Sequence, residues 1–120
     1  MEPTPGVTLW SLRAAVTVDL LAVLAQPVLA GRYLTGDVDA IAVHRAVGSG
    51  LAALGLVTIG AALLHVTAGR GPLWVLPVAV GYFLALGLQL GMGFARQMRL
   101  HVPLGSVLVV GTVLLAIWVW

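Results

Sequence analysis

Two similar six-residue stretches each open a long apolar run, His44-Arg45-Ala46-Val47-Gly48-Ser49 and His101-Val102-Pro103-Leu104-Gly105-Ser106. In each stretch a histidine stands four residues before a glycine, and residues four apart lie on one face of a helix. Each imidazole therefore lies beside a position with no side chain. The repetition predicts two related helices, and the apolar sequence around them predicts where those helices sit.

Four segments are long and apolar enough to cross a bilayer, which takes about 20 residues. We expect them at about Trp10–Ala30, Ile41–Val66, Leu73–Ala95 and Leu100–Trp120. The breaks between them are short and contain glycine, arginine or proline. Short connections favour antiparallel neighbours. The sequence thus predicts an all-α, up-down-up-down bundle of four transmembrane helices, forming one domain over residues 1–120, with two helical hairpins related by a pseudo-two-fold axis.

The composition supports a membrane protein. Of 120 residues, 61% are hydrophobic and 8% are charged, against about 25% charged in a typical soluble domain. The charged groups are six arginines and four acids, too few for the basic patch of a nucleic-acid-binding protein. The absence of cysteine excludes disulfides, thiolate metal sites and covalent c-type haem attachment. The bilayer is the one partner that composition alone predicts.

His44 and His101 are the candidate metal ligands. Helices two and four start on the same side of the membrane, so the two imidazoles are expected at similar depth. Imidazole ligates haem iron, zinc and other transition metals. A zinc site usually needs a third or fourth protein ligand, and no carboxylate shares the helical face of either histidine. Haem b, which needs two axial ligands and an apolar slot beside Gly48 and Gly105, is the predicted cofactor.

Other polar residues fall on the side of the two histidines. Arg45 and Arg99 flank them and are candidates for pairing with the haem propionates, because arginine binds carboxylates in a bidentate manner. Gln26 and Gln89, in helices one and three, lie toward the same side and are further candidate cofactor-binding residues. The excess of arginine there also fits the positive-inside rule, which would make this side cytoplasmic.

Several stretches resemble the haem A synthase family. Val43-His44-Arg45-Ala46-Val47-Gly48-Ser49 is similar to the family's His-Arg-x-x-Gly-Ser stretch. Leu88-Gln89-Leu90-Gly91-Met92-Gly93, followed by Leu100-His101, is similar to its Gln-x-x-x-Gly stretch ahead of the next histidine. Leu24-Ala25-Gln26-Pro27-Val28-Leu29-Ala30-Gly31 is similar to the corresponding part of its first helix. The chain would match one four-helix half of the eight-helix enzyme.

The resemblance implies a haem held between His44 and His101, on the side facing away from the cytoplasm. The family also has a glutamate just before the first histidine, implicated in oxidising the haem methyl group. Here Ile41, Ala42 and Val43 stand at those positions, and the nearest acid is Asp39. The resemblance thus implies haem binding more than haem A synthesis.

Three functions remain open from the sequence. The first is a b-type haem protein of the cytoplasmic membrane, serving electron transfer or haem handling with a redox partner protein. The second is a half-size enzyme of the haem A synthase type that acts as a homodimer and depends on Asp39. The third is a cofactor-free membrane subunit or carrier. Asp19 and His65 lie away from the predicted haem and are possible partners for each other, with His65 more typical of a membrane interface.

Overall fold

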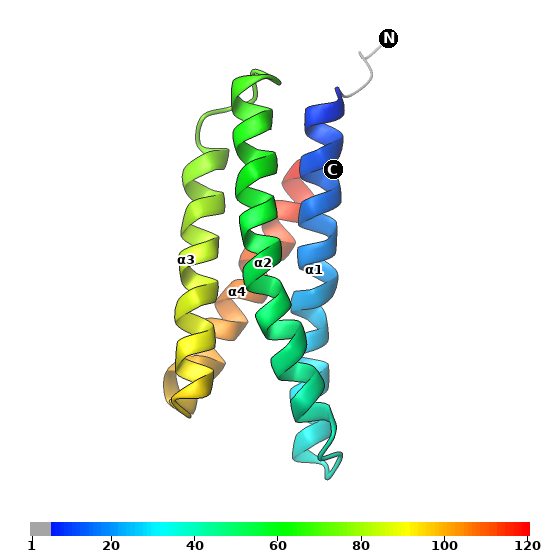
Figure 1. Cartoon of the computed structure of the whole chain (residues 1–120), viewed down its shortest axis with the longest axis vertical. Helices are drawn as coiled ribbons and strands as arrows, with labels where there is room; N and C mark the ends of the chain where they lie inside the picture. Colours follow the sequence, from blue (N-terminus) through cyan, green and yellow to red (C-terminus); the bar gives the residue numbers. More distant parts are fainter. Residues whose placement is uncertain (1–5) are drawn as a thin grey trace.

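The computed structural model describes residues 6–120 and contains four α-helices in that range. They are α1 (Val7–Leu34), α2 (Ala40–Thr67), α3 (Val75–Phe94) and α4 (Met98–Val119) (Figure 1). Each is long and apolar enough to cross a membrane. The predicted all-helical bundle of four membrane-spanning helices is confirmed.

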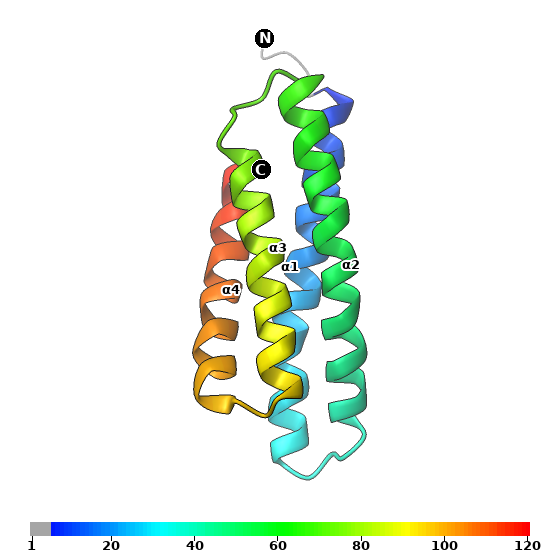
Figure 2. The ribbon, with the colours of Figure 1, turned by 60° about the vertical axis from the view of Figure 1, so that its left-hand side comes forward.

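The chain runs up and down through the bundle, with the α1–α2 and α3–α4 connections at one end and the α2–α3 connection at the other (Figures 1 and 2). Each helix packs against two others: α1 and α3 both contact α2 and α4. Helices α2 and α4 are therefore diagonal neighbours, and so are α1 and α3. A side chain that points inward from α2 faces one that points inward from α4.

The first hairpin is longer than predicted. Helix α1 continues through Gly31-Arg32-Tyr33-Leu34, which we expected to be a loop, because Tyr33 and Leu34 do not break a helix. The chain turns at Gly36, whose φ of +106° favours a residue without Cβ. At about 1.5 Å per residue, the 28 residues of α1 and of α2 exceed the roughly 30 Å hydrocarbon core. The first hairpin accordingly projects beyond α3 and α4 in Figure 1.

The interior is layered. One apolar cluster contains Leu12, Ala15, Val16, Ala61, Ala62, Val75, Ala79, Ala116 and Val119. A second cluster contains Val23, Leu51, Leu86 and Leu108. Between them lies a layer of polar side chains, one from each helix.

The buried core does not reach the end of the bundle at which α2 and α4 begin. Beyond Val23 in α1, Leu86 in α3, and before Leu108 in α4, none of the described residues of these helices is fully buried. In α2 the same holds before Leu51, apart from Ala40 at the first turn. The two candidate histidines lie in this less tightly packed end.

Candidate functional site

His44 and His101 lie side by side in the interior, although 57 residues separate them. Their ring centres are 6.2 Å apart and their planes are tilted by 60°. His44 lies in the second turn of α2 and His101 in the first turn of α4, the two diagonal helices. Both rings are partly buried. The structure thus brings together the two candidate ligands named from the sequence.

Each histidine is oriented by the same hydrogen bond. His44 Nδ1 lies 3.1 Å from the backbone oxygen of Gln26, and His101 Nδ1 lies 2.9 Å from the backbone oxygen of Gln89. A carbonyl oxygen only accepts hydrogen bonds, so in each pair Nδ1 carries the proton and donates. In a neutral imidazole the other nitrogen, Nε2, then holds a free lone pair. Both rings are therefore set in the tautomer in which Nε2 can bind a metal.

The glutamine side chains occupy the space beside the two glycines. A Cβ atom at Gly105 would lie 2.8 Å from Gln89 Nε2, and a Cβ at Gly48 would lie 3.6 Å from Gln26 Oε1. Gln89 Nε2 is also 3.4 Å from His101 Nε2, where it can donate to the lone pair. The Gln26 side-chain amide lies 3.1 Å from His44 Nδ1 and 3.2 Å from both the His44 backbone oxygen and the Gly48 N–H. The glycines thus make room for two amides that contact the histidine turns.

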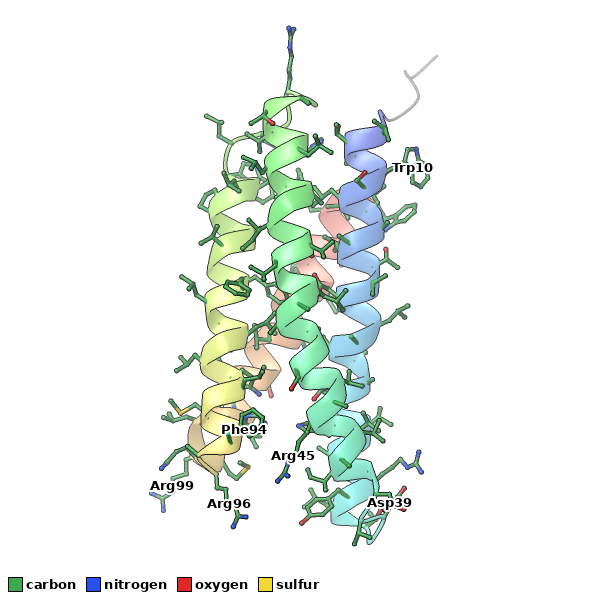
Figure 3. The ribbon with its side chains drawn as sticks, viewed as in Figure 1. Trp10, Asp39, Arg45, Phe94, Arg96 and Arg99 are labelled. Atoms are coloured by element: carbon green, nitrogen blue, oxygen red, sulfur yellow. The ribbon has the colours of Figure 1, made fainter. Side chains whose placement is uncertain are left out.

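We call the part of the bundle that contains Gln26, His44, Gln89 and His101 the histidine end. Three arginines lie at this end: Arg45 in α2, Arg96 after α3 and Arg99 in α4 (Figure 3). All three are exposed, and none forms a salt bridge with any residue in the range 6–120. Arg32, in contrast, pairs with Asp37 at 2.5 Å. The two arginines proposed from the sequence, Arg45 and Arg99, therefore have a third neighbour in Arg96.

Three further contacts at this end were not predicted. The backbone oxygens of Gln26 and Gln89 orient the histidines, whereas the sequence pointed to the glutamines only by their position. A Cβ at Gly93 would lie 2.9 Å from His101 Cε1, so this glycine lets α3 approach the ring. The histidine-to-glycine spacing in the sequence draws attention to Gly105, but nothing comparable marks Gly93.

Asp39, the residue on which the enzymatic alternative depends, is the N-cap residue of α2 and is exposed. Its side chain makes no capping hydrogen bond. In Figure 3 it lies on the far side of α2 from the Arg45 side chain. The structure gives Asp39 no contact with the histidine pair.

Asp19 and His65, which the sequence suggested as possible partners, bond to other residues. The Thr58 hydroxyl donates to Asp19 Oδ2 at 2.5 Å in the middle of the bundle. His65 lies at the opposite end from His44 and His101, with Nδ1 3.5 Å from Thr8 Oγ1. His65 is 8% exposed and lies in the last turn of α2, so protein encloses it near the helix end, where we expected a membrane interface.

The donor set limits the kinds of metal site. Within residues 6–120, no group of three or more His, Cys, Asp or Glu side chains is placed to hold a metal ion. Two imidazoles alone fall short of the three or four protein ligands typical of zinc. They match the two axial positions of a haem in number.

No protein family model, no curated protein and no solved structure matches this chain.

Proposed function

We propose that this protein is an integral-membrane b-type haem protein in which His44 and His101 are the two axial ligands and whose role is electron transfer. The observation that carries the proposal is the matched pair of Nδ1 hydrogen bonds, to Gln26 and to Gln89, on two rings 6.2 Å apart. One such histidine could serve packing alone. Two with the same tautomer, with ring centres 6.2 Å apart on diagonal helices, are what bis-histidine ligation requires.

The ring spacing fits a metal between the two imidazoles. A metal–nitrogen bond of about 2 Å, with the ring centre about 1.1 Å behind the nitrogen, separates two opposed ring centres by about 6 Å. The measured separation is 6.2 Å. Gln89 Nε2 now stands near His101 Nε2, so binding requires this flexible side chain to turn away.

The packing around the pair also favours a large apolar ligand. Soluble and membrane proteins alike pack their interiors densely, yet the buried core here ends above Gln26 and Gln89. A haem would supply the missing apolar contacts at the histidine end. Arg45, Arg96 and Arg99 lie at the same end without salt-bridge partners among the described residues, and they can pair with the two propionates. Charge and shape thus point to the same ligand.

The residues also indicate the kind of chemistry. Bound haem supplies one-electron exchange. The backbone oxygens of Gln26 and Gln89 accept the Nδ1 protons, which fixes the ring orientations and raises the basicity of Nε2. With both axial positions taken by imidazole, no site remains for oxygen or substrate. Asp39, which is exposed and lies on the far side of α2 from Arg45 in Figure 3, adds no group for haem oxidation.

The wider setting of the protein follows from the same proposal. A half-size relative of haem A synthases would lie in the cytoplasmic membrane with the histidine end facing outward. Its arginines would then serve the propionates instead of marking the cytoplasmic side. An electron carrier of this size also needs a redox partner protein or a second copy of itself.

An optical spectrum tests the proposal. The protein, purified in detergent and supplied with haemin, is measured oxidised and after dithionite reduction. We expect a sharp Soret band and resolved α and β bands, as given by six-coordinate haem. His44→Ala and His101→Ala should each lose these features, whereas His65→Ala, which removes the histidine at the opposite end, should keep them.

Two results would overturn the proposal. One is a protein that stays colourless and takes up no added haemin although circular dichroism shows it to be helical. The other is equal loss of the spectrum in all three alanine variants, which would mean that haem binds without specific histidine ligation.

A further inference from the structure

A polar layer crosses the middle of the bundle. It contains Asp19 from α1, Thr58 from α2, Tyr82 from α3 and Thr112 from α4. Asp19, Thr58 and Thr112 are 1–2% exposed. Apolar clusters lie on both sides of the layer, one containing Val16 and one containing Val23. Asp19, Thr58 and Thr112 are thus separated from water, and Tyr82 is partly buried beside them.

Asp19 and Tyr82 occupy equivalent places in the two hairpins. Each lies seven residues before the glutamine that orients a histidine, Gln26 or Gln89. Because α1 and α3 are diagonal neighbours, the two side chains point toward the bundle axis from opposite sides. The Tyr82 hydroxyl oxygen is buried, as is Asp19 Oδ1.

Two oxygen atoms in this layer have no hydrogen-bond partner, Asp19 Oδ1 and the Tyr82 hydroxyl. The other polar atoms are satisfied: Thr58 donates to Asp19 Oδ2, and the Thr112 hydroxyl donates to the Leu108 backbone oxygen. A buried polar atom left without a partner is costly. The pairing within the layer is thus incomplete at two atoms that share one depth in the bundle.

An ionised Asp19 would have no counter-charge among the described residues. The nearest basic residue along α1 is Arg13, about 9 Å away at 1.5 Å per residue. Its Nε donates to the Val119 backbone oxygen, and its guanidinium lies over Trp10 and Trp120. Burying an uncompensated carboxylate is far more costly than burying a neutral acid.

We propose that the polar layer is a proton-binding site in the middle of the membrane, in which Asp19 is a neutral carboxylic acid and its Oδ1–H group faces the Tyr82 hydroxyl. The added proton turns Oδ1 from an unpaired acceptor into a donor. The Tyr82 oxygen can then accept it, either directly or through one water molecule. Both unpaired atoms gain a partner, and Thr58 keeps its bond to Oδ2. The site binds one proton and needs no haem, so it is independent of the function proposed above.

Infrared spectroscopy of the purified protein, in detergent and without haem, tests this site. At about pH 8 an ordinary aspartate is ionised, since its pKa is about 3.9. We expect the carbonyl band of one protonated carboxylic acid to persist at that pH and to shift in heavy water. Asp19→Asn should abolish the band, whereas Asp39→Asn, which alters an exposed aspartate, should keep it.

Two milder variants report on the hydrogen bonds of the acid. Thr58→Val removes the donor to Oδ2, and Tyr82→Phe removes the predicted acceptor of the Oδ1 proton. Each should move the carbonyl band to higher frequency while leaving it present, so the proposal can be tested even if Asp19→Asn fails to fold. The proposal is overturned if the wild type shows no protonated-acid band at pH 8. It is also overturned if the band persists in Asp19→Asn, or if neither Thr58→Val nor Tyr82→Phe shifts it.

Discussion

The two ends of the bundle use similar residues in opposite ways. At the end where α1 begins, which we call the tryptophan end after Trp10 and Trp120, Arg13 donates to the Val119 backbone oxygen at 2.6 Å. Its guanidinium carbon lies 5.1 Å from the Trp10 ring centre and 4.9 Å from that of Trp120. Arg45, at the histidine end, has no salt bridge with a described residue.

The histidines differ in the same way. His65, near the tryptophan end, is enclosed by the α2–α3 connection, where any Cβ added at Gly71 would collide with its ring. His44 and His101 are bonded through Nδ1 and lie in the part of the bundle with little buried core. The tryptophan end has its polar groups satisfied and its interior filled. At the histidine end Arg45, Arg96 and Arg99 form no salt bridge with a described residue, and His101 Nε2 is contacted by the flexible Gln89 side chain.

The largest expected effect is from Arg13→Ala. It removes a hydrogen bond from a charged group, worth about 1.5–3 kcal/mol, together with two cation–π contacts of about 0.5–1 kcal/mol each. We expect a loss of about 3 kcal/mol in the free energy of unfolding, measured by thermal or denaturant unfolding of the haem-free protein in detergent. Arg45→Ala is the matched control and should cost less than about 0.5 kcal/mol. Equal losses would contradict the difference between the two ends.

A matched pair of valines measures how far the packed core extends. Val16 is 0% exposed in the first apolar cluster, whereas Val47 is partly exposed on α2 between His44 and Gly48. Val16→Ala should cost about 2 kcal/mol, because the surrounding helices do not collapse into the space of two methyl groups. Val47→Ala should cost less than about 1 kcal/mol in the haem-free protein. If Val47→Ala proves as costly, the histidine end is packed more firmly than the burial pattern indicates.

Alanine substitutions at two glycines compare how costly a close contact is at each end of the bundle. Gly71→Ala forces a Cβ against the His65 ring, which is held between Thr8 and the α2–α3 connection. Overpacking of this kind costs about 1–3 kcal/mol. Gly105→Ala meets the end of the Gln89 side chain, which can turn away, so its cost should stay below about 1 kcal/mol. Thermal midpoints of the two haem-free variants, measured side by side, decide this, and a larger loss in Gly105→Ala would contradict it.

Sequence reasoning predicted the parts that depend on hydrophobic length and chain direction. Four apolar segments with short connections determine an up-and-down bundle, and two helices starting on one side place His44 and His101 at one level. It did not predict the partners of His65 or Asp19, because these depend on the rotation of each helix about its axis. The bonds from the histidine Nδ1 atoms to Gln26 and Gln89 depend on the same rotation. A helix that is apolar on every side gives little information about which face turns inward.

The smallest effects concern two arginines with left-handed backbone conformations, one at each end. Arg70 has a φ of +53° in the α2–α3 connection, and Arg96 has a φ of +57° between α3 and α4. Such a φ costs an L-residue about 1–2 kcal/mol relative to its usual conformations. Glycine relieves that strain but adds freedom to the unfolded chain, so Arg70→Gly and Arg96→Gly should each raise the free energy of unfolding by up to about 1 kcal/mol.

The two arginine variants should differ in how tightly they retain haem. Arg96 lies at the histidine end, where we propose that it pairs with a propionate, so Arg96→Gly should weaken haem retention several-fold although it stabilises the apoprotein. Arg70→Gly, at the other end, should leave haem retention unchanged. Transfer of haem to excess apomyoglobin, followed in the Soret band, measures both. If the two variants lose haem at the same rate, Arg96 does not pair with a propionate. The propionate contacts would then be made by Arg45 and Arg99 alone.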